Sequence, residues 1–193
     1  KNADRPDEST LKASGASGVI RKGNDIQIVF GPKVSVIKSA LEDYMENPLS
    51  DSFDDVIVRE EKAFSADPET LCAFTSGEVI PLSQVKDEVF STETLGKGFA
   101  IKSDCGRIYS PCNGTIESVF DTKHAVNIVS ESGAEVLIHV GIDTVKLGGR
   151  FFEANVKDGD KIKVGDTLLT FDDEAISGEG YDTTAVLVVC NSD

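Results

Sequence analysis

From about Leu71 onward, the chain reads as a series of short β-strands separated by glycine-containing turns. Turn signals such as Asn113-Gly114 and Asp158-Gly159 interrupt runs of alternating and β-branched residues, and no long helical period appears. We expect strands at Glu78–Ile80, Gly98–Ile101, Arg107–Tyr109, Gly114–Phe120, Ala125–Ile128, Glu135–Val140, Lys161–Ile162, Thr167–Phe171 and Val186–Val189. Many short strands at close spacing bury their apolar faces by pairing two sheets or closing one. Residues 71–193 are therefore predicted to form an all-β sandwich or a distorted antiparallel β-barrel.

The first 47 residues have a different character. Two strands are expected at Gly18–Ile20 and Ile26–Phe30, joined by a Gly23-Asn24 turn, and a helix is expected to open at Pro32. Such a piece is too small to bury a core of its own, so it is predicted to be a partial α/β fragment. Residues 48–70 contain prolines and acidic pairs, which is typical of a linker.

The net charge of −15 limits the kinds of partner. Nucleic acids and anionic membrane surfaces bind basic patches, so neither is an expected partner. No apolar stretch approaches the roughly 18 residues that a membrane helix needs. The four cysteines form no Cys-x-x-Cys pair, and we interpret them as reduced thiols of a cytoplasmic protein.

The chain has only two histidines, His124 and His139, and both fall in segments predicted to be strands. A Ser132-Gly133 turn separates the two segments, so a hairpin can place the two rings side by side. Two adjacent imidazoles suit proton transfer, phosphoryl transfer or metal binding. The alternative, two ordinary half-buried side chains on a strand, stays open at this point.

Two longer segments resemble a known family. They are SPCNGTIESVFDTKHAVNI and HVGIDTVKLGGRFFEANVKDGDKIKVGDTLLTFD, with Thr-x-His in the first and His-x-Gly-Ile-Asp-Thr-Val in the second. Residues 71–193 resemble the glucose-type enzyme IIA domain of the bacterial phosphoenolpyruvate-dependent sugar phosphotransferase system. The resemblance implies a phosphoryl carrier in sugar uptake, which is a phosphotransferase component without a cofactor or metal.

The same resemblance implies roles for particular residues. His139 would accept a phosphoryl group from the phosphocarrier protein HPr and pass it to a cysteine of a IIB domain. His124 would be the neighbouring imidazole, and Thr122, two residues earlier on the same strand face, would orient it. Gly141 would allow close backbone approach to the phosphate. The remaining partner-binding positions are Asp143, expected to contact the partner or the loop backbone, and an apolar rim of Phe120, Leu137 and Val145.

The N-terminal segment LKASGASGVIRKGNDIQIVFGPKVSVIKSALEDYM resembles the C-terminal half of a glucose-type IIB domain. It lacks the family's phosphorylated cysteine in a Cys-Ile-Thr-Arg-Leu-Arg type motif, so we expect it to be chemically inert. A IIB fragment, a linker and a IIA domain in this order imply a membrane-associated permease, whose IIC domain would be a further partner. The family continues beyond Val186–Val189 into another strand, and we expect that strand to be missing.

Two other functions remain to be weighed against the phosphoryl carrier. A zinc-binding hydrolase of a related β fold needs three protein ligands, and two histidines without a His-x-His pair fall short. A biotinyl or lipoyl carrier module would share the turns of residues 157–169, but no Met-Lys-Met or Asp-Lys-Ala hairpin supplies the carrier lysine.

Overall fold

The computed structural model describes residues 16, 18–22, 25–29 and 69–192. Within the first 47 residues, β1 (Gly18–Lys22) and β2 (Asp25–Val29) pair antiparallel, with Gly18 opposite Val29. The predicted pairing of two strands in this segment is therefore confirmed. The Gly23-Asn24 turn, the helix expected from Pro32 and nearly all of the acidic linker lie outside the described residues.

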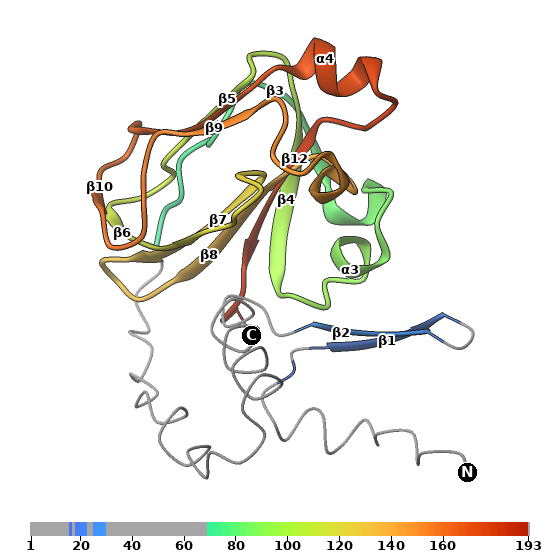
Figure 1. The fold of residues 1–193 in the computed structure, drawn as a ribbon. Coiled ribbons are helices and arrows are strands. Elements are labelled where there is room, and N and C mark those ends of the chain that lie inside the picture. Colours follow the sequence, from blue (N-terminus) through green and yellow to red (C-terminus); the bar gives the residue numbers. More distant parts are fainter. Residues whose placement is uncertain (1–15, 17, 23–24, 30–68, 193) are drawn as a thin grey trace, which may run out of the picture.

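Residues 69–192 form two antiparallel sheets (Figure 1). The larger sheet has seven strands in the order β10-β6-β7-β8-β12-β4-β3. Its strands are β3 (Gly77–Pro81), β4 (Lys97–Ser103), β6 (Gly114–Val119), β7 (Ala125–Ser130), β8 (Glu135–Val140), β10 (Lys161–Ile162) and β12 (Thr184–Val189). The smaller sheet has the order β5-β11-β9, formed by β5 (Arg107–Tyr109), β11 (Thr167–Phe171) and β9 (Phe152–Ala154).

The main core lies between the two sheets. Ile116, Val126 and Leu187 of the large sheet join Ile108 and Leu169 of the small sheet in one buried cluster. Burying one apolar face of each sheet against the other removes both from water, which is the main favourable term in folding. The β-sandwich predicted from the strand pattern is confirmed.

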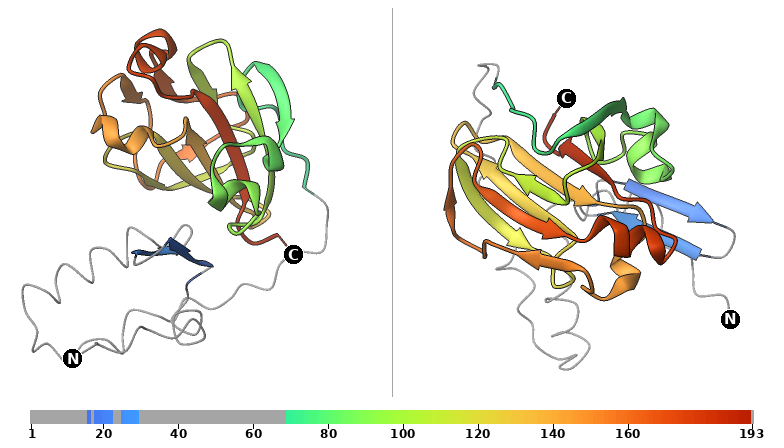
Figure 2. Two further views of the ribbon diagram at one scale, coloured as in Figure 1. Left: turned by 90° about the vertical axis from the view of Figure 1, so that its right-hand side faces the viewer. Right: turned by 90° about the horizontal axis from the view of Figure 1, so that it is seen from above.

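A second, smaller cluster covers part of the other face of the large sheet. The 3₁₀-helix η3 (Leu82–Gln84) and the helix α3 (Glu88–Ser91) lie against β4 and β12 there (Figures 1 and 2). Val186 and Val188 of β12 face this cluster, whereas Ala185 and Leu187 face the main core. This two-sided burial explains why β12 is a nearly continuous apolar run instead of an alternating one.

Short helical elements were not expected from the sequence. Besides η3 and α3, the structure contains the 3₁₀-helix η4 (Thr144–Leu147) and α4 (Asp173–Gly178). Asp87 caps α3 by accepting from the amides of Val89 and Phe90, and Asp172 caps α4 through Ala175. Among the described residues, no helix is long and apolar enough to span a membrane.

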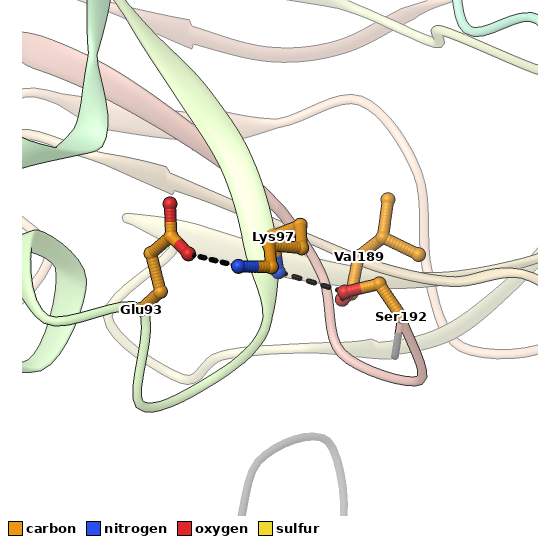
Figure 3. A network of polar contacts seen from close by, with 4 residues as sticks. All are labelled: Glu93, Lys97, Val189 and Ser192. Atoms are coloured by element: carbon orange, nitrogen blue, oxygen red, sulfur yellow. Dashed lines mark hydrogen bonds and ion pairs between the residues drawn. The ribbon is translucent and has the colours of Figure 1, made fainter.

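Two polar clamps fasten the ends of the domain. At the end where it begins, the Glu69 carboxylate accepts hydrogen bonds from the hydroxyls of Ser130 and Ser132, at the turn between β7 and β8. At the other end, Ser192 Oγ accepts from the Lys97 amide at 2.7 Å and donates to the Val189 carbonyl (Figure 3). Lys97 also pairs with Glu93 at 2.5 Å. Both clamps tie a chain segment to a strand end.

Candidate functional site

His139 lies near the end of β8, in the interior of the large sheet. Its register places it opposite Ala125 of β7 and Val186 of β12. Leu137, two residues earlier on β8, points to the same face and belongs to the smaller cluster. The site is therefore built on the sheet face opposite the main core, where the short helices pack.

His124 precedes β7 instead of lying within it, which corrects its predicted place in a strand. Lys123 adopts a left-handed backbone conformation with φ of 54°, and this turn changes the direction of the chain just before the strand. The His124 carbonyl still accepts from the Val140 amide at 2.7 Å. As a result, the two imidazole rings meet edge-on, with centroids 4.7 Å apart and planes at 87°.

Thr122 also lies in this turn and not on a strand face, but the expected contact is present. Its Oγ1 is 2.6 Å from His124 Nδ1, and either the hydroxyl or the ring N–H can donate. A hydrogen bond at one ring nitrogen fixes both the orientation of the imidazole and the tautomer at the other nitrogen. Thr122 is therefore positioned to orient His124.

Two phenylalanine rings flank the histidine pair. Phe120 contacts His124 edge-on at 5.5 Å, and Phe90 of α3 contacts His139 at 5.2 Å with a tilt of 60°. Phe90 was not identified from the sequence, although the Asp87 cap preceding Glu88–Ser91 is a helix-start signal that marks its segment. Of the other predicted rim residues, Leu137 is buried in the same cluster as Phe90, and Val145 on η4 is 50% exposed.

Both imidazoles are strongly biased toward the neutral form. Burial lowers the pKa of His124 to about 3, and the neighbouring His139 adds to this effect. Burial also lowers the pKa of His139 to about 4, against the opposing effects of the Gly141 backbone and the Asp143 carboxylate. His139 Nδ1 is buried, and it has no hydrogen-bond partner among the described residues. The pair thus offers uncharged ring nitrogens at neutral pH.

The loop after β8 depends on Gly141. Its φ is +77°, and a Cβ there would lie 2.4 Å from Thr144 Cγ2 and 2.7 Å from the Asp182 carbonyl oxygen. The Gly141 amide donates to the Thr184 carbonyl at 3.0 Å. This glycine therefore permits close packing between segments of the chain and fixes the path of the loop beside His139, and the expected close approach to the phosphate stays a prediction.

Asp143 follows in the same loop with a left-handed φ of 62°. Its carboxylate does not cap η4 and instead pairs with Lys146 Nζ at 2.7 Å. Of the contacts expected for Asp143, the one with the loop backbone is thus replaced by a side-chain ion pair. Across residues 69–192 and the N-terminal hairpin, no group of three or more His, Cys, Asp or Glu side chains could hold a metal ion.

Comparisons with known proteins agree with this geometry. Residues 69–193 match the family model described as phosphoenolpyruvate-dependent sugar phosphotransferase system, EIIA 1. Among solved structures, the chain is similar to the glucose permease IIA from Mycoplasma capricolum, at 35% sequence identity and a TM-score of 0.60. That similarity covers 64% of this chain and 80% of the other.

The match confirms the predicted resemblance to a IIA domain, whereas the IIB-like character of residues 1–47 stays a prediction. Domains of this family interact with HPr and with IIB domains. The chain belongs to the EIIA 1 family of the phosphoenolpyruvate-dependent sugar phosphotransferase system, and it is a phosphoryl carrier, a phosphotransferase component of that system.

Proposed function

We propose that His139 is the residue that carries the phosphoryl group, taking it from phospho-HPr and passing it to the cysteine of a IIB domain. The observation that carries this assignment is the unequal exposure of the two histidine residues. His124 is 3% exposed and its Nδ1 is engaged by Thr122, whereas His139 is only half-buried. A carrier must present its nucleophile to two successive partners, and His139 is the more exposed of the two residues.

The protonation state allows either ring to act as the nucleophile, His139 included. A ring nitrogen attacks phosphorus with its lone pair, so the imidazole must be uncharged, and a pKa near 4 leaves His139 neutral throughout the physiological range. Because Nδ1 is buried, Nε2 is the nitrogen proposed to react. The new P–N bond forms at Nε2 as the P–N bond of phospho-HPr breaks, and a proton replaces the phosphoryl group on the leaving imidazole.

His124 and Thr122 are proposed to position the phosphoryl group. The Thr122 hydroxyl holds His124 Nδ1, so the other nitrogen of that ring remains for the phosphoryl oxygens. The edge-on packing of the two rings brings His124 next to His139 without a charge on either. Phosphoryl transfer depends mainly on such positioning and on charge neutralisation.

The partner surface is proposed to surround this pair. Phe120 and Val145, both accessible to solvent, would form its apolar rim, with Leu137 packed beneath and Asp143 as a charged contact. The net charge of −15 favours encounter with partners that present positive charge. We further propose a cytoplasmic location within a permease that includes a IIC domain, with residues 1–47 as part of a IIB domain and 48–70 as its linker to the IIA domain at 71–193.

A phosphotransfer assay tests the assignment. The full chain is incubated with phosphoenolpyruvate, enzyme I and HPr, and phosphate is located by mass spectrometry at alkaline pH, where phosphohistidine survives. We expect one phosphate on His139, none in His139→Ala and continued labelling in His124→Ala. Because the chain has only two histidines, each variant is the control for the other. Phosphate on His124, or none on a folded wild-type chain, would refute the assignment.

A further inference from the structure

The loop that follows β8 is fastened to the chain segment that leads into β12. The Gly141 amide donates a hydrogen bond to the Thr184 carbonyl at 3.0 Å. The next amide, that of Ile142, donates to the Asp182 carbonyl, also at 3.0 Å. Because Gly141 is only two residues after His139, these two hydrogen bonds determine where the chain goes as it leaves the site.

The Asp182 side chain shapes the segment that supplies these carbonyl groups. Its Oδ1 accepts hydrogen bonds from the Thr184 amide at 2.8 Å and from the Thr184 hydroxyl at 2.5 Å. An aspartate that binds an amide two residues further along holds its own backbone in a turn. Thr184 is buried, so its hydroxyl needs a partner, and the exposed Asp182 supplies one. The turn thereby directs the Asp182 carbonyl toward the Ile142 amide.

The contact between this turn and the loop is tight. A Cβ on Gly141 would lie 2.7 Å from the Asp182 carbonyl oxygen, so no side chain fits between them. Further along the loop, the Thr144 hydroxyl at the start of η4 donates to the Val140 carbonyl at 2.6 Å. The same 3₁₀-helix carries Val145, which is 50% exposed. The Asp182 turn and the Thr144 hydroxyl thus place η4, with its exposed valine, next to the end of β8.

The backbone of His139 is held independently of these contacts. β8 lies between β7 and β12, and His139 is opposite Ala125 on one side and Val186 on the other. A change at Asp182 should therefore move the loop and η4 while the histidine stays in place. The expected consequence is weaker docking of a partner, with little change in the transfer step itself.

We propose that Asp182 is a positioning residue for partner docking in phosphoryl transfer: through its turn at Thr184 it fixes the loop after β8 and holds Val145 at the rim of the partner surface. The proposal rests on the proposed function, with His139 as the acceptor and Val145 in the rim. The Asp182 carboxylate acts as a hydrogen-bond acceptor for Thr184, so its negative charge is not required. An uncharged side chain with an oxygen in the same place should serve equally well.

Single-turnover transfer from phospho-HPr to the full-length chain tests the proposal. Varying the phospho-HPr concentration gives a maximal rate and a half-saturating concentration. Asp182→Ala should raise the half-saturating concentration about fivefold, as expected for one lost hydrogen bond, and leave the maximal rate within about twofold. Asp182→Asn keeps the acceptor oxygen and should restore the wild-type value. Hydrogen exchange at the Ile142 amide should be faster in Asp182→Ala, which would locate the effect in the loop.

Asp166→Ala is the matched control. The exposed Asp166 also binds a nearby amide, that of Lys163 at 2.8 Å, but in the turn between β10 and β11. This variant should leave both kinetic values and the Ile142 exchange rate unchanged. Asp182→Ser, whose hydroxyl forms the same kind of turn more weakly, should lie between wild type and Asp182→Ala, and it replaces the alanine variant if that variant fails to fold.

The proposal is overturned if Asp182→Ala leaves the half-saturating concentration or the Ile142 exchange rate unaltered. It is also overturned if Asp182→Asn shares the defect of Asp182→Ala, because the charge would then be a direct contact with the partner. Failure of His139 to take up phosphate in the wild-type chain would instead refute the acceptor assignment.

Discussion

The two faces of the large sheet differ in what packs against them. The main core faces a second sheet, and its members come from regular strands on both sides. The smaller cluster faces η3 and α3, and it contacts both His139 and the turn before β7. The strands of both sheets supply the main core, whereas Phe90 of α3 and Phe120 flank the reactive rings. The main core and the histidine pair therefore lie on opposite faces of the large sheet.

The largest expected effect comes from opening the main core. Leu187 is fully buried there, so Leu187→Ala should reduce the free energy of unfolding by about 3 kcal/mol, from lost burial and the remaining cavity. Urea unfolding would measure this change. Val79→Ala, at a position 65% exposed on the edge strand β3, should change it by less than about 0.5 kcal/mol.

If the two faces are independent, folded Leu187→Ala should still accept phosphate at the wild-type rate per molecule. A loss of transfer in the folded variant would show that the main core also positions the histidines, and would contradict the separation.

A medium effect on the free energy of unfolding is expected when acid protonates His124. His124 has a folded-state pKa of about 3 and an unfolded value of about 6.5, so below pH 6.5 the unfolded chain binds a proton that the folded chain excludes. Stability due to this ring is therefore full above pH 6.5 and declines as the pH falls toward 3. At pH 5 the loss is about 2 kcal/mol.

Comparing urea unfolding of the wild type and His124→Gln between pH 8 and pH 5 isolates this contribution from the carboxylates. The variant should show the shallower decline. NMR of the two ring signals offers a direct check, since neither imidazole should titrate above pH 5. A midpoint near 6.5 for either ring would contradict the burial argument.

A smaller effect is expected from Phe90. Phe90→Leu removes the ring that contacts His139 and should lower the free energy of unfolding by about 1 kcal/mol. Water reaching His139 would weaken the desolvation that lowers its pKa, so this pKa should rise toward its ordinary value. Phe171→Leu, which alters a stacked pair with Phe152 in the main core, should cost similar stability and leave both histidine signals in place. Equal shifts of the His139 pKa in both variants would contradict the difference between the two faces of the sheet.

The parts of the fold predicted from the sequence are those where the pattern is local. Four strands were predicted with the bounds that the structure shows, because in each an alternating pattern or a short apolar run is followed by a turn signal. They are Arg107–Tyr109, Glu135–Val140, Lys161–Ile162 and Thr167–Phe171. Phe152–Ala154 was not predicted, since three residues are too few for a period. The helix α3 was not predicted either, because its four residues are too few to show a helical period.

The candidate site shows the same limit. The histidines could be selected because the chain has no others, and the family resemblance supplied Thr122, Gly141 and Asp143. The position of His124 outside β7 could not be predicted, because it depends on the left-handed conformation of Lys123. Phe90 contacts His139 only after folding brings a distant helix to the sheet, which no local pattern encodes.

The clamp at Glu69 fixes the domain at the end farthest from its chemistry. Glu69 binds the turn between β7 and β8, whereas the histidines lie at the opposite ends of these strands, a distance on the order of 20 Å for six-residue strands. Because Glu69 and its two serine partners lie at the far ends of these strands, this attachment point does not occupy the surface around the histidines.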